Sequence, residues 1–545
     1  MTAEPVDFVP PSADLGLPPR LNSFHKDAGL RVPTRDGEFL MTDVLVPETD
    51  EPRGTILIRS SYGRGYPYDG VWSHPYAERG YHVVIQSVRG TFGSTGAFEP
   101  MVNEVDDAQD TVAWLREQSW FDGRLATLGS SYLGYTQFGL LMDPPPELRA
   151  SIVVTGPHDF GRNFWGNGSG AFSLETFLMW SALVGHQERP DAMRWMSTMN
   201  AGLTDAYRHL PLKDAAEPVL EGLSPWYEEW LKHPDPHDPC WKAYDLGKAL
   251  HQVTTPTLLI GGWYDLFLDQ TFTQYETLHT RGIDVALTIG PWYHGDAAMA
   301  PAVAQQALAW LNENVSGVGS RTRPQPVHVA LTGTEPTVWR DLPAWPPKSD
   351  EHTLHLAPEG RLSTAATDGS TVSAFTYDPS DPTPSLGGRA GLPGTVDITV
   401  DTSVIEGRDD VLTFTAPPAT GPLDILGAPV TELILSVDNP HADVYVRLCD
   451  VAPDGASHHI TDTLIRLDPA VPVGVEQHLT LTLDPCAHRL NTGHRLRLQI
   501  AGGAHPRFAR NLGTDEPLAT ATTLRPSRHT IHHVGSRVSI PVTPS

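Results

Sequence analysis

The stretch LATLGSSYLGY, residues 125–135, decides the fold of this chain. An apolar run ends abruptly in Gly-Ser-Ser, and aliphatic and aromatic residues resume after Gly134. This pattern predicts a buried strand, a sharp turn and the start of a helix. A serine at such a turn is lifted out of the sheet above a helix N-terminus, as in the nucleophile elbow of hydrolases. Ser131 is therefore the candidate nucleophile.

One position of this stretch departs from the general elbow motif. The general motif is Gly-x-Ser-x-Gly, whereas centring it on Ser131 places the second glycine, Gly134, one residue late. So short a match is also compatible with an ordinary strand-to-helix turn. The rest of the chain has to decide between the two interpretations.

The flanking sequence predicts an α/β class with a largely parallel sheet. Short apolar runs alternate with amphipathic patterns, which is typical of parallel sheets. Strands are predicted at 39–46, 54–59, 81–86, 150–155, 255–260 and 285–289, and helices at 102–118 and 303–314. Residues 1–30 are polar and proline-rich and predict an arm laid over the surface.

Two other segments have a different character. Residues 158–250 are rich in aromatics at helical spacing and predict a helical cap, whose rings form a small core and also line a pocket, with Trp165, Phe172 and Trp180 as candidate pocket residues. Short alternating runs after residue 327 predict an all-β jelly-roll sandwich. The predicted domains are the first half of the core at 1–157, the cap at 158–250, the second half of the core at 251–325 and the β-sandwich at 326–545.

Composition limits the class of protein and its partners. A chain of 545 residues is too long to fold around a single hydrophobic core, so several domains are expected. The formal charge of −27 argues against nucleic acid or an anionic membrane as partner. Neither a signal peptide nor an apolar run long enough to span a membrane is recognisable. The three cysteines are widely spaced, which predicts reduced, buried thiols in a cytoplasmic protein.

The sequence predicts neither a metal nor an organic cofactor. No CxxC or HExxH spacing occurs. The pairs His458–His459 and His532–His533 are adjacent, and adjacent residues of a strand point to opposite faces. We interpret them as surface or packing histidines.

Two later strand ends carry the residue types that activate a serine. A serine hydroxyl needs a histidine to accept its proton and a carboxylate to orient that histidine. Asp265 follows the predicted strand at 255–260, and His294 follows the one at 285–289, in the order expected for this fold. Trp263 and Phe267, on either side of Asp265, are further candidate pocket residues. The alternatives are a helix N-cap for Asp265 and a loop histidine bonded to backbone for His294.

Acyl transfer also needs donors for the developing oxyanion. The backbone N–H of Tyr132, at the start of the predicted helix, is one candidate. The loop after residues 54–59 offers the phenol of Tyr62 as the second. An aromatic residue packed at the sheet edge is the alternative for Tyr62.

Several motifs together resemble one family. GSSYLG at 129–134, GWYD at 262–265 and GPWYH at 290–294 are similar to the signatures of the cocaine esterase-like family. These are the X-Pro dipeptidyl-peptidase-type serine hydrolases, which include α-amino acid ester hydrolases, and their elbow has the late glycine. Further matching stretches are DTVAWL at 110–115, VRGTFGSTG at 88–96, YDPSDP at 377–382, GHRLRL at 493–498 and PRFARN at 506–511.

The resemblance implies a fold and a set of roles. It implies an α/β-hydrolase core with an inserted helical cap and a C-terminal jelly roll. It implies Ser131 as nucleophile, His294 as base and Asp265 as its orienting carboxylate, with Tyr62 and the Tyr132 amide as oxyanion hole. The predicted function is hydrolysis of a small-molecule carboxylic ester or amide through an acyl-enzyme.

Two alternatives to this function stay open. One is a dipeptidyl-peptidase, α-amino acid ester hydrolase or acyltransferase with the same triad. Such enzymes need acidic residues for a substrate ammonium, and the sequence offers Asp235 and Asp238 without placing them. The other is a non-catalytic protein that binds carbohydrate or a partner. The natural substrate and the oligomeric state, a homo-oligomer included, are left undetermined.

Overall fold

The polypeptide passes three times between two separately packed units. In the computed structural model, which describes residues 15–65, 70, 72–389 and 400–543, unit 1 consists of Met1–Phe160 and Cys240–His328. Unit 2 consists of Gly161–Pro239 and Val329–Ser545. The helical segment between the two halves of unit 1 therefore packs with the C-terminal part of the chain.

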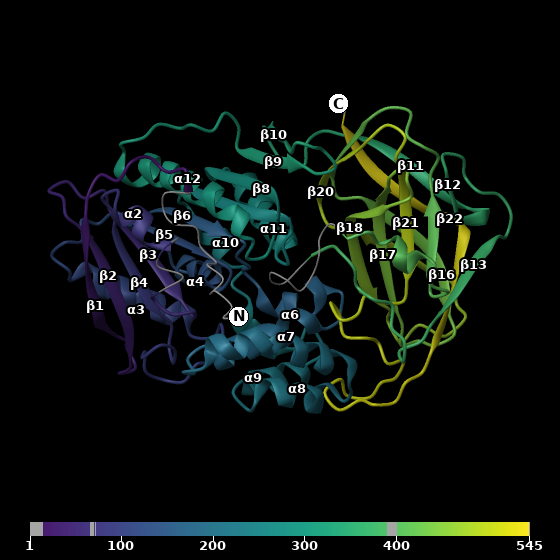
Figure 1. Cartoon of the computed structure of the whole chain (residues 1–545), viewed down its shortest axis with the longest axis horizontal. Coiled ribbons are helices and arrows are strands. Elements are labelled where there is room, and N and C mark those ends of the chain that lie inside the picture. The colour runs from purple at the N-terminus through teal and green to yellow at the C-terminus, as the bar shows by residue number, and fades with distance from the viewer. Residues whose placement is uncertain (1–14, 66–69, 71, 390–399, 544–545) are drawn as a thin grey trace, which may run out of the picture. The chain divides into compact units, whose positions relative to one another are not determined.

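The sheet of unit 1 has the order β1-β2-β4-β3-β5-β6-β7-β8 (Figure 1). From β4 to β8 all neighbours are parallel, whereas β1 and β2 are antiparallel additions at one edge. The strands are β1 (Phe24–Pro33), β2 (Phe39–Pro47), β3 (Thr55–Ser60), β4 (His82–Ser87), β5 (Leu125–Ser130), β6 (Leu148–Val154), β7 (Thr257–Tyr264) and β8 (Val285–Tyr293). The predicted largely parallel α/β sheet is confirmed.

Helices connect these parallel strands. Every residue of β3 and β4 is buried, as expected for strands covered on both faces. The helices of unit 1 are α2 (His74–Ala77), α3 (Glu104–Arg116), α4 (Tyr132–Leu141), α10 (Ala249–Gln252), α11 (Leu268–Thr280) and α12 (Ala300–Leu311), with a π-turn at Asn312–Ser316. Helix α4 is buried along its whole length, so the helix that follows the elbow lies inside the unit.

The expected surface arm at 1–30 is wrong for its last part. Residues Phe24–Pro33 form β1, antiparallel to β2, while residues 1–14 lie outside the described part. Most side chains of β1 are exposed, but Val32 is buried opposite Leu40. An edge strand with one solvated face is polar, and that polarity is what suggested an arm.

Strands β7 and β8 continue beyond their predicted ends at residues 260 and 289. They reach Tyr264 and Tyr293, so that Asp265 and His294 each directly follow a strand. The two strands come very close near their ends, because a Cβ at Gly262 would lie 2.2 Å from the carbonyl oxygen of Trp292. Only glycine permits this approach, which brings the two following residues together.

The helical insertion packs against β-strand loops within unit 2. Its helices are α5 (Phe160–Phe164), α6 (Leu174–His186), α7 (Ala192–Arg208), α8 (Leu212–Leu220) and α9 (Pro225–Leu231). Backbone hydrogen bonds fix it to the C-terminal part, from Ala509 N to Phe172 O (2.8 Å) and from Lys213 N to Ala519 O (3.1 Å). The insertion and the β-strands therefore share one packed unit.

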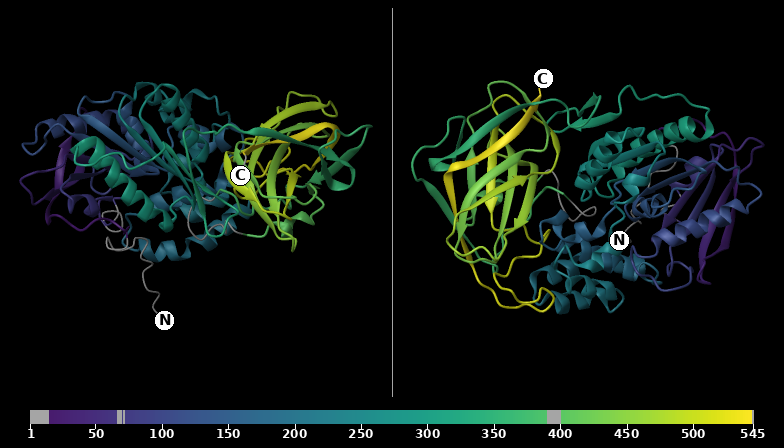
Figure 2. Two further views of the ribbon diagram at one scale, coloured as in Figure 1. Left: turned by 90° about the horizontal axis from the view of Figure 1, so that it is seen from above. Right: turned by 180° about the vertical axis from the view of Figure 1, so that it is seen from behind.

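Among its described residues, the C-terminal part of unit 2 is all-β apart from the short helix α13 (Ser403–Glu406) and a 3-10 turn at Pro358–Gly360. Figure 2 shows the strands of this part in green to yellow. Alternate residues of β16 are buried, which builds an apolar interior from Leu433, Leu435 and their neighbours. The strands are β10 (Val338–Leu342), β11 (Asp350–Ala357), β12 (Arg361–Ser363), β13 (Val372–Tyr377), β14 (Val411–Thr415), β15 (Leu423–Gly427), β16 (Val430–Val437), β17 (Asp443–Val451), β18 (Ser457–Arg466), β19 (Gln477–Thr482), β20 (Cys486–Leu490), β21 (Arg495–Ala501) and β22 (Ser527–Thr543), with β9 (Val327–Leu331) leading from unit 1. The predicted all-β C-terminal domain is confirmed.

No helix in the described ranges combines the length and the apolar character that a membrane span requires.

A buried carboxylate in this β-domain makes stability dependent on pH. Asp424 accepts two hydrogen bonds from Arg489 (2.6 and 2.7 Å) and one from Arg340 (3.1 Å). Burial opposes ionisation of Asp424, but the two arginines outweigh it and lower its pKa. A group with a lowered folded-state pKa contributes stability above its unfolded value of about 3.9 and loses it as the pH falls through the lower folded-state value.

Replacing Asp424 with alanine is therefore expected to destabilise the β-domain by about 3 kcal/mol at pH 7, because two arginines lose their partner. The value lies at the low end for buried pairs, since the arginine side chains are 23% and 35% exposed. Urea denaturation at pH 7 and at pH 3 measures the effect, which should be smaller at pH 3. Asp381→Asn, in a pair whose carboxylate is 79% exposed, is the control and should cost under about 0.5 kcal/mol. Equal losses for both variants would contradict the assignment.

Candidate active site

Ser131 occupies a strained turn between β5 and α4. Its backbone has φ 59° and ψ −123°, a conformation that residues other than glycine rarely adopt. The surrounding hydrogen bonds hold it there, from Ser131 N to Val154 O (3.0 Å) and from Tyr135 N to Ser131 O (3.0 Å). Strain of this kind concentrates at functional positions, and here it raises the serine above the helix.

The glycines of the elbow motif are explained by close packing. A Cβ at Gly129 would lie 2.6 Å from the carbonyl oxygen of Leu133, and one at Gly134 would lie 2.7 Å from the Cα of Gly156. Gly134 therefore lets helix α4 approach the backbone that follows β6. The late glycine of the motif is required by this contact rather than by the turn itself.

The structure brings Ser131, His294 and Asp265 into one chain of contacts. His294 Nε2 lies 2.9 Å from Ser131 Oγ, and His294 Nδ1 lies 2.7 Å from Asp265 Oδ2. A carboxylate can only accept, so Nδ1 carries the proton and Nε2 is left to accept from the serine hydroxyl. This is the arrangement in which a histidine can act as a base toward a serine.

Asp265 is held so that its carboxylate faces the histidine. The residue is 1% exposed, and its Oδ1 accepts a hydrogen bond from Phe267 N at 2.7 Å. The ring of Phe267 packs edge-on against His294, with 5.2 Å between the ring centroids. The same short segment therefore fixes the carboxylate and shields the imidazole from water.

The two predicted oxyanion donors lie on neighbouring elements. Tyr132 is the first residue of α4, where backbone N–H groups have no partner within the helix. Tyr62 follows β3, and its N–H donates to Ser60 Oγ at 3.0 Å. The rings of Tyr62 and Tyr132 meet edge-on with centroids 6.4 Å apart.

The loop that carries Tyr62 is anchored by Arg64. Its guanidinium donates to Ser87 Oγ (2.5 Å), to Phe92 O (3.0 Å) and to Asp43 Oδ1 (3.2 Å). These contacts tie the loop to β2, to the last residue of β4 and to the segment that follows it. The backbone near Tyr62 is therefore fixed from several sides.

The candidate pocket residues divide between the units. In unit 1, Phe267 contacts His294, while Trp263 stacks on Phe272 of α11 at 5.8 Å. In unit 2, Trp165 and Phe172 are fully buried against each other, and Trp180 stacks on Trp230 of α9 at 6.2 Å. These contacts show that the candidate residues pack against other aromatic rings, and their role in binding substrate stays a prediction.

Sequence reasoning missed Arg59 and Glu104, two buried charged residues beside the site. Arg59 lies at the end of β3, and Glu104 is the first residue of α3. The signal was present, because an arginine that ends the apolar run Thr-Ile-Leu-Ile needs a buried acidic partner.

Two family models match most of the chain. The model for X-Pro dipeptidyl-peptidase (S15 family) matches residues 36–296, and the model for the X-Pro dipeptidyl-peptidase C-terminal non-catalytic domain matches residues 319–539. The cocaine esterase of Rhodococcus sp. (strain MB1 Bresler) is 29% identical over 541 residues, covering 90% of this chain and 93% of that protein.

Solved structures show the same fold over the whole chain. An aminopeptidase from a marine sediment Thaumarchaeota archaeon has a TM-score of 0.80 at 21% identity. An α-amino acid ester hydrolase has a TM-score of 0.79 at 23% identity. In both comparisons 100% of this chain and 99% of the other are covered.

Proposed function

Since the chain belongs to the X-Pro dipeptidyl-peptidase (S15) family of serine hydrolases, we propose that it cleaves a carboxylic ester or amide through an acyl-enzyme on Ser131. The observation that carries the proposal is the chain of contacts from Ser131 Oγ through His294 to Asp265, at 2.9 and 2.7 Å. Three residues from separate strand ends meet with the donor and acceptor roles that acyl transfer needs.

In the first half-reaction Ser131 Oγ attacks the substrate carbonyl carbon and gives its proton to His294 Nε2. Asp265 stabilises the imidazolium through the Nδ1 hydrogen bond. The negative charge on the former carbonyl oxygen would be bound by the Tyr132 N–H and the Tyr62 phenol. The tetrahedral intermediate then expels the alcohol or amine, which takes the proton from His294 and leaves an acyl-serine.

In the second half-reaction a water molecule gives a proton to His294 and attacks the acyl-serine. The second tetrahedral intermediate collapses, Ser131 Oγ recovers its proton, and the carboxylic acid is released. The same residues thus act twice, and the resting arrangement of hydrogen bonds is restored.

A fluorophosphonate probe tests the nucleophile on the unaltered protein. Phosphonylation with loss of fluoride is expected at a stoichiometry of about one per chain, since one activated serine reacts. Mass spectrometry of the digested protein should locate the adduct on the peptide containing Ser131, and turnover of p-nitrophenyl butyrate should be lost in parallel. Labelling elsewhere, or full turnover of the labelled protein, would contradict Ser131 as the nucleophile, whereas absence of both labelling and turnover would favour a non-catalytic role.

The family also contains peptidases and amino acid ester hydrolases, so an aminoacyl substrate is the second candidate. It is supported by the match of residues 36–296 to an X-Pro dipeptidyl-peptidase model. Comparing rates for an aminoacyl ester and its des-amino analogue separates the two, because only a pocket with an anionic group favours the ammonium form. Acyl transfer in place of hydrolysis would appear as a new ester when an alcohol is added.

The finer organisation is proposed on the same basis. We infer a core at 1–157 and 251–325, a cap at 158–250 and a jelly roll at 326–545, in line with the break between the two family matches.

A cytoplasmic location is supported by the buried thiols of Cys449 and Cys486, whose pKa values burial raises to about 11 and about 12. Cys240, expected to be buried, is half-buried. The charge of −27 supports a small-molecule substrate rather than nucleic acid or a membrane, and a homo-oligomer is compatible with it.

A further inference from the structure

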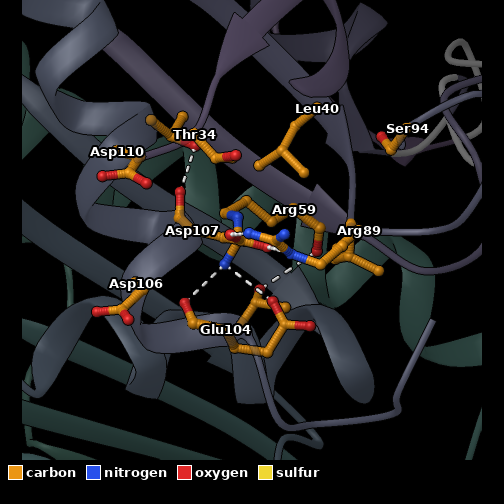
Figure 3. A network of polar contacts seen from close by, with 12 residues as sticks. Thr34, Leu40, Arg59, Arg89, Ser94, Glu104, Asp106, Asp107 and Asp110 are labelled. Atoms are coloured by element: carbon orange, nitrogen blue, oxygen red, sulfur yellow. Dashed lines mark hydrogen bonds and ion pairs between the residues drawn. The ribbon is translucent and has the colours of Figure 1, made fainter. Parts of the chain in front are cut away.

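A buried arginine stands beside the proposed oxyanion hole. Arg59 is 3% exposed, and its Nε donates to Gln86 Oε1 at 3.0 Å. Its guanidinium forms an ion pair with Glu104 at 2.9 Å and also donates to the Glu104 carbonyl oxygen at 2.9 Å. In Figure 3 the guanidinium lies between Glu104 and Asp107. A charge this deep in the protein requires such partners.

Glu104 contacts the residue next to the nucleophile. Its Oε1 accepts a hydrogen bond from the hydroxyl of Tyr132 at 2.8 Å, and the same hydroxyl accepts one from Met101 N at 2.8 Å. Burial raises the pKa of Glu104, and Arg59 opposes that rise. Burial also raises the pKa of Tyr132 well above its usual value, so its hydroxyl keeps the proton that it donates to Glu104.

The charges around Glu104 are balanced by a second arginine. Asp107 of the same helix accepts a hydrogen bond from Arg89 at 2.5 Å (Figure 3), and Arg89 also donates to Asp36 at 2.7 Å. Two arginines thus face Glu104 and Asp107 in the interior. The cluster keeps Glu104 in place without leaving an isolated charge, which the low dielectric of the interior would penalise.

We propose that Glu104 is a positioning residue that ties the two oxyanion donors together, by holding the Tyr132 side chain and Arg59 at once. The inference rests on the proposed function. Tyr132 follows Ser131 and offers its N–H, while Arg59 is the next-to-last residue of β3, the strand that leads into the Tyr62 loop. With the Tyr132 ring fixed by Glu104 and Met101, the first turn of α4 cannot rotate, and its N–H keeps its direction.

Tyr132→Phe tests this role by removing one oxygen atom. We expect kcat for p-nitrophenyl butyrate to fall about 10-fold with KM within about 2-fold, because a displaced donor weakens only the transition state. The Ki of phenylboronic acid should rise by about the same factor. In that adduct Ser131 Oγ binds boron, its proton passes to His294, and a boronate oxygen occupies the oxyanion position.

Tyr135→Phe is the matched control. Tyr135 lies on the same helix, is equally buried, and donates to the carbonyl oxygens of Met101 (3.2 Å) and Tyr244 (3.3 Å). Tyr135→Phe loses a buried hydrogen bond to Met101 but leaves the hydrogen bond from the Tyr132 hydroxyl to Glu104 in place, so its kcat and boronate affinity should stay within about 2-fold of wild type. The two melting temperatures should fall by similar amounts.

Glu104→Gln supplies the second variant. It keeps the size of the side chain but removes the charge that binds Arg59, and its kcat should fall at least as far as that of Tyr132→Phe. If this variant does not fold, the comparison of Tyr132→Phe with Tyr135→Phe still tests the positioning role of Glu104. Equal values of kcat and of the boronate Ki for that pair, or an effect of Tyr132→Phe on KM alone, would overturn the inference. A wild-type protein without Ser131 labelling would instead overturn the proposed function.

Discussion

Ser131→Ala is expected to lower kcat for p-nitrophenyl butyrate by about 10⁵-fold, with KM within about 3-fold of wild type. The variant removes the only atom that forms the acyl-enzyme bond in the proposed mechanism. The turn itself should survive, because alanine tolerates the φ of 59° no worse than serine does. Steady-state kinetics on enzyme of checked fold and purity measure the effect, since trace wild-type protein would hide it.

Ser130→Ala is the control for this prediction. Ser130 is adjacent in sequence, but its hydroxyl lies 3.1 Å from Thr155 Oγ1, whereas the hydroxyl of Ser131 lies 2.9 Å from the imidazole. Its kcat should stay within about 3-fold of wild type, since it forms no bond to substrate. The assignment of Ser131 fails if the two variants retain similar activity.

Asp265→Asn is expected to lower kcat by about 10⁴-fold, a loss of the size seen when the orienting carboxylate of such a triad becomes an amide. An asparagine amide can donate to Nδ1, which favours the tautomer with the proton on Nε2. That nitrogen then cannot accept the serine proton. The hydrogen bond from Phe267 N to Oδ1 can persist, so the fold should be unchanged.

The matched control is Asp296→Asn, two residues beyond His294. Asp296 caps a short turn by accepting from Ala298 N at 2.9 Å, and asparagine caps as well as aspartate. Its kcat should change less than about 3-fold. A loss in Asp265→Asn no greater than in this control would show that the carboxylate does not orient the histidine.

Much of the core and of the candidate site follows from short-range patterns. The apolar run before Ser131, the turn and the following helix appear as predicted, because a buried parallel strand and its crossover helix leave strong local signals. Asp265 and His294 could be placed together because adjacent parallel strands end at the same edge of a sheet. Fold class and family were thus accessible from the sequence.

What could not be predicted depends on contacts between distant residues. Glu104 reads as an ordinary acidic residue at a helix start, and only the folded structure brings it to Tyr132 and Arg59. Strand β1 was missed because an edge strand with a polar face lacks the apolar alternation of a core strand. The partners of Glu104 are remote in sequence, so no local pattern records them, whereas β1 pairs with the neighbouring β2 and was missed only because its exposed face is polar.

The shared packing of the helical insertion and the β-domain has a consequence for how such proteins diversify. Residues 161–239 are bonded through Phe172 and Lys213 to Ala509 and Ala519, near the C-terminus. A recombination event that exchanged the insertion alone would place it against a C-terminal part with which it had not evolved to pack. An exchange that kept this packing would have to carry both stretches together, although the second half of the α/β core and most of the β-domain lie between them in the sequence.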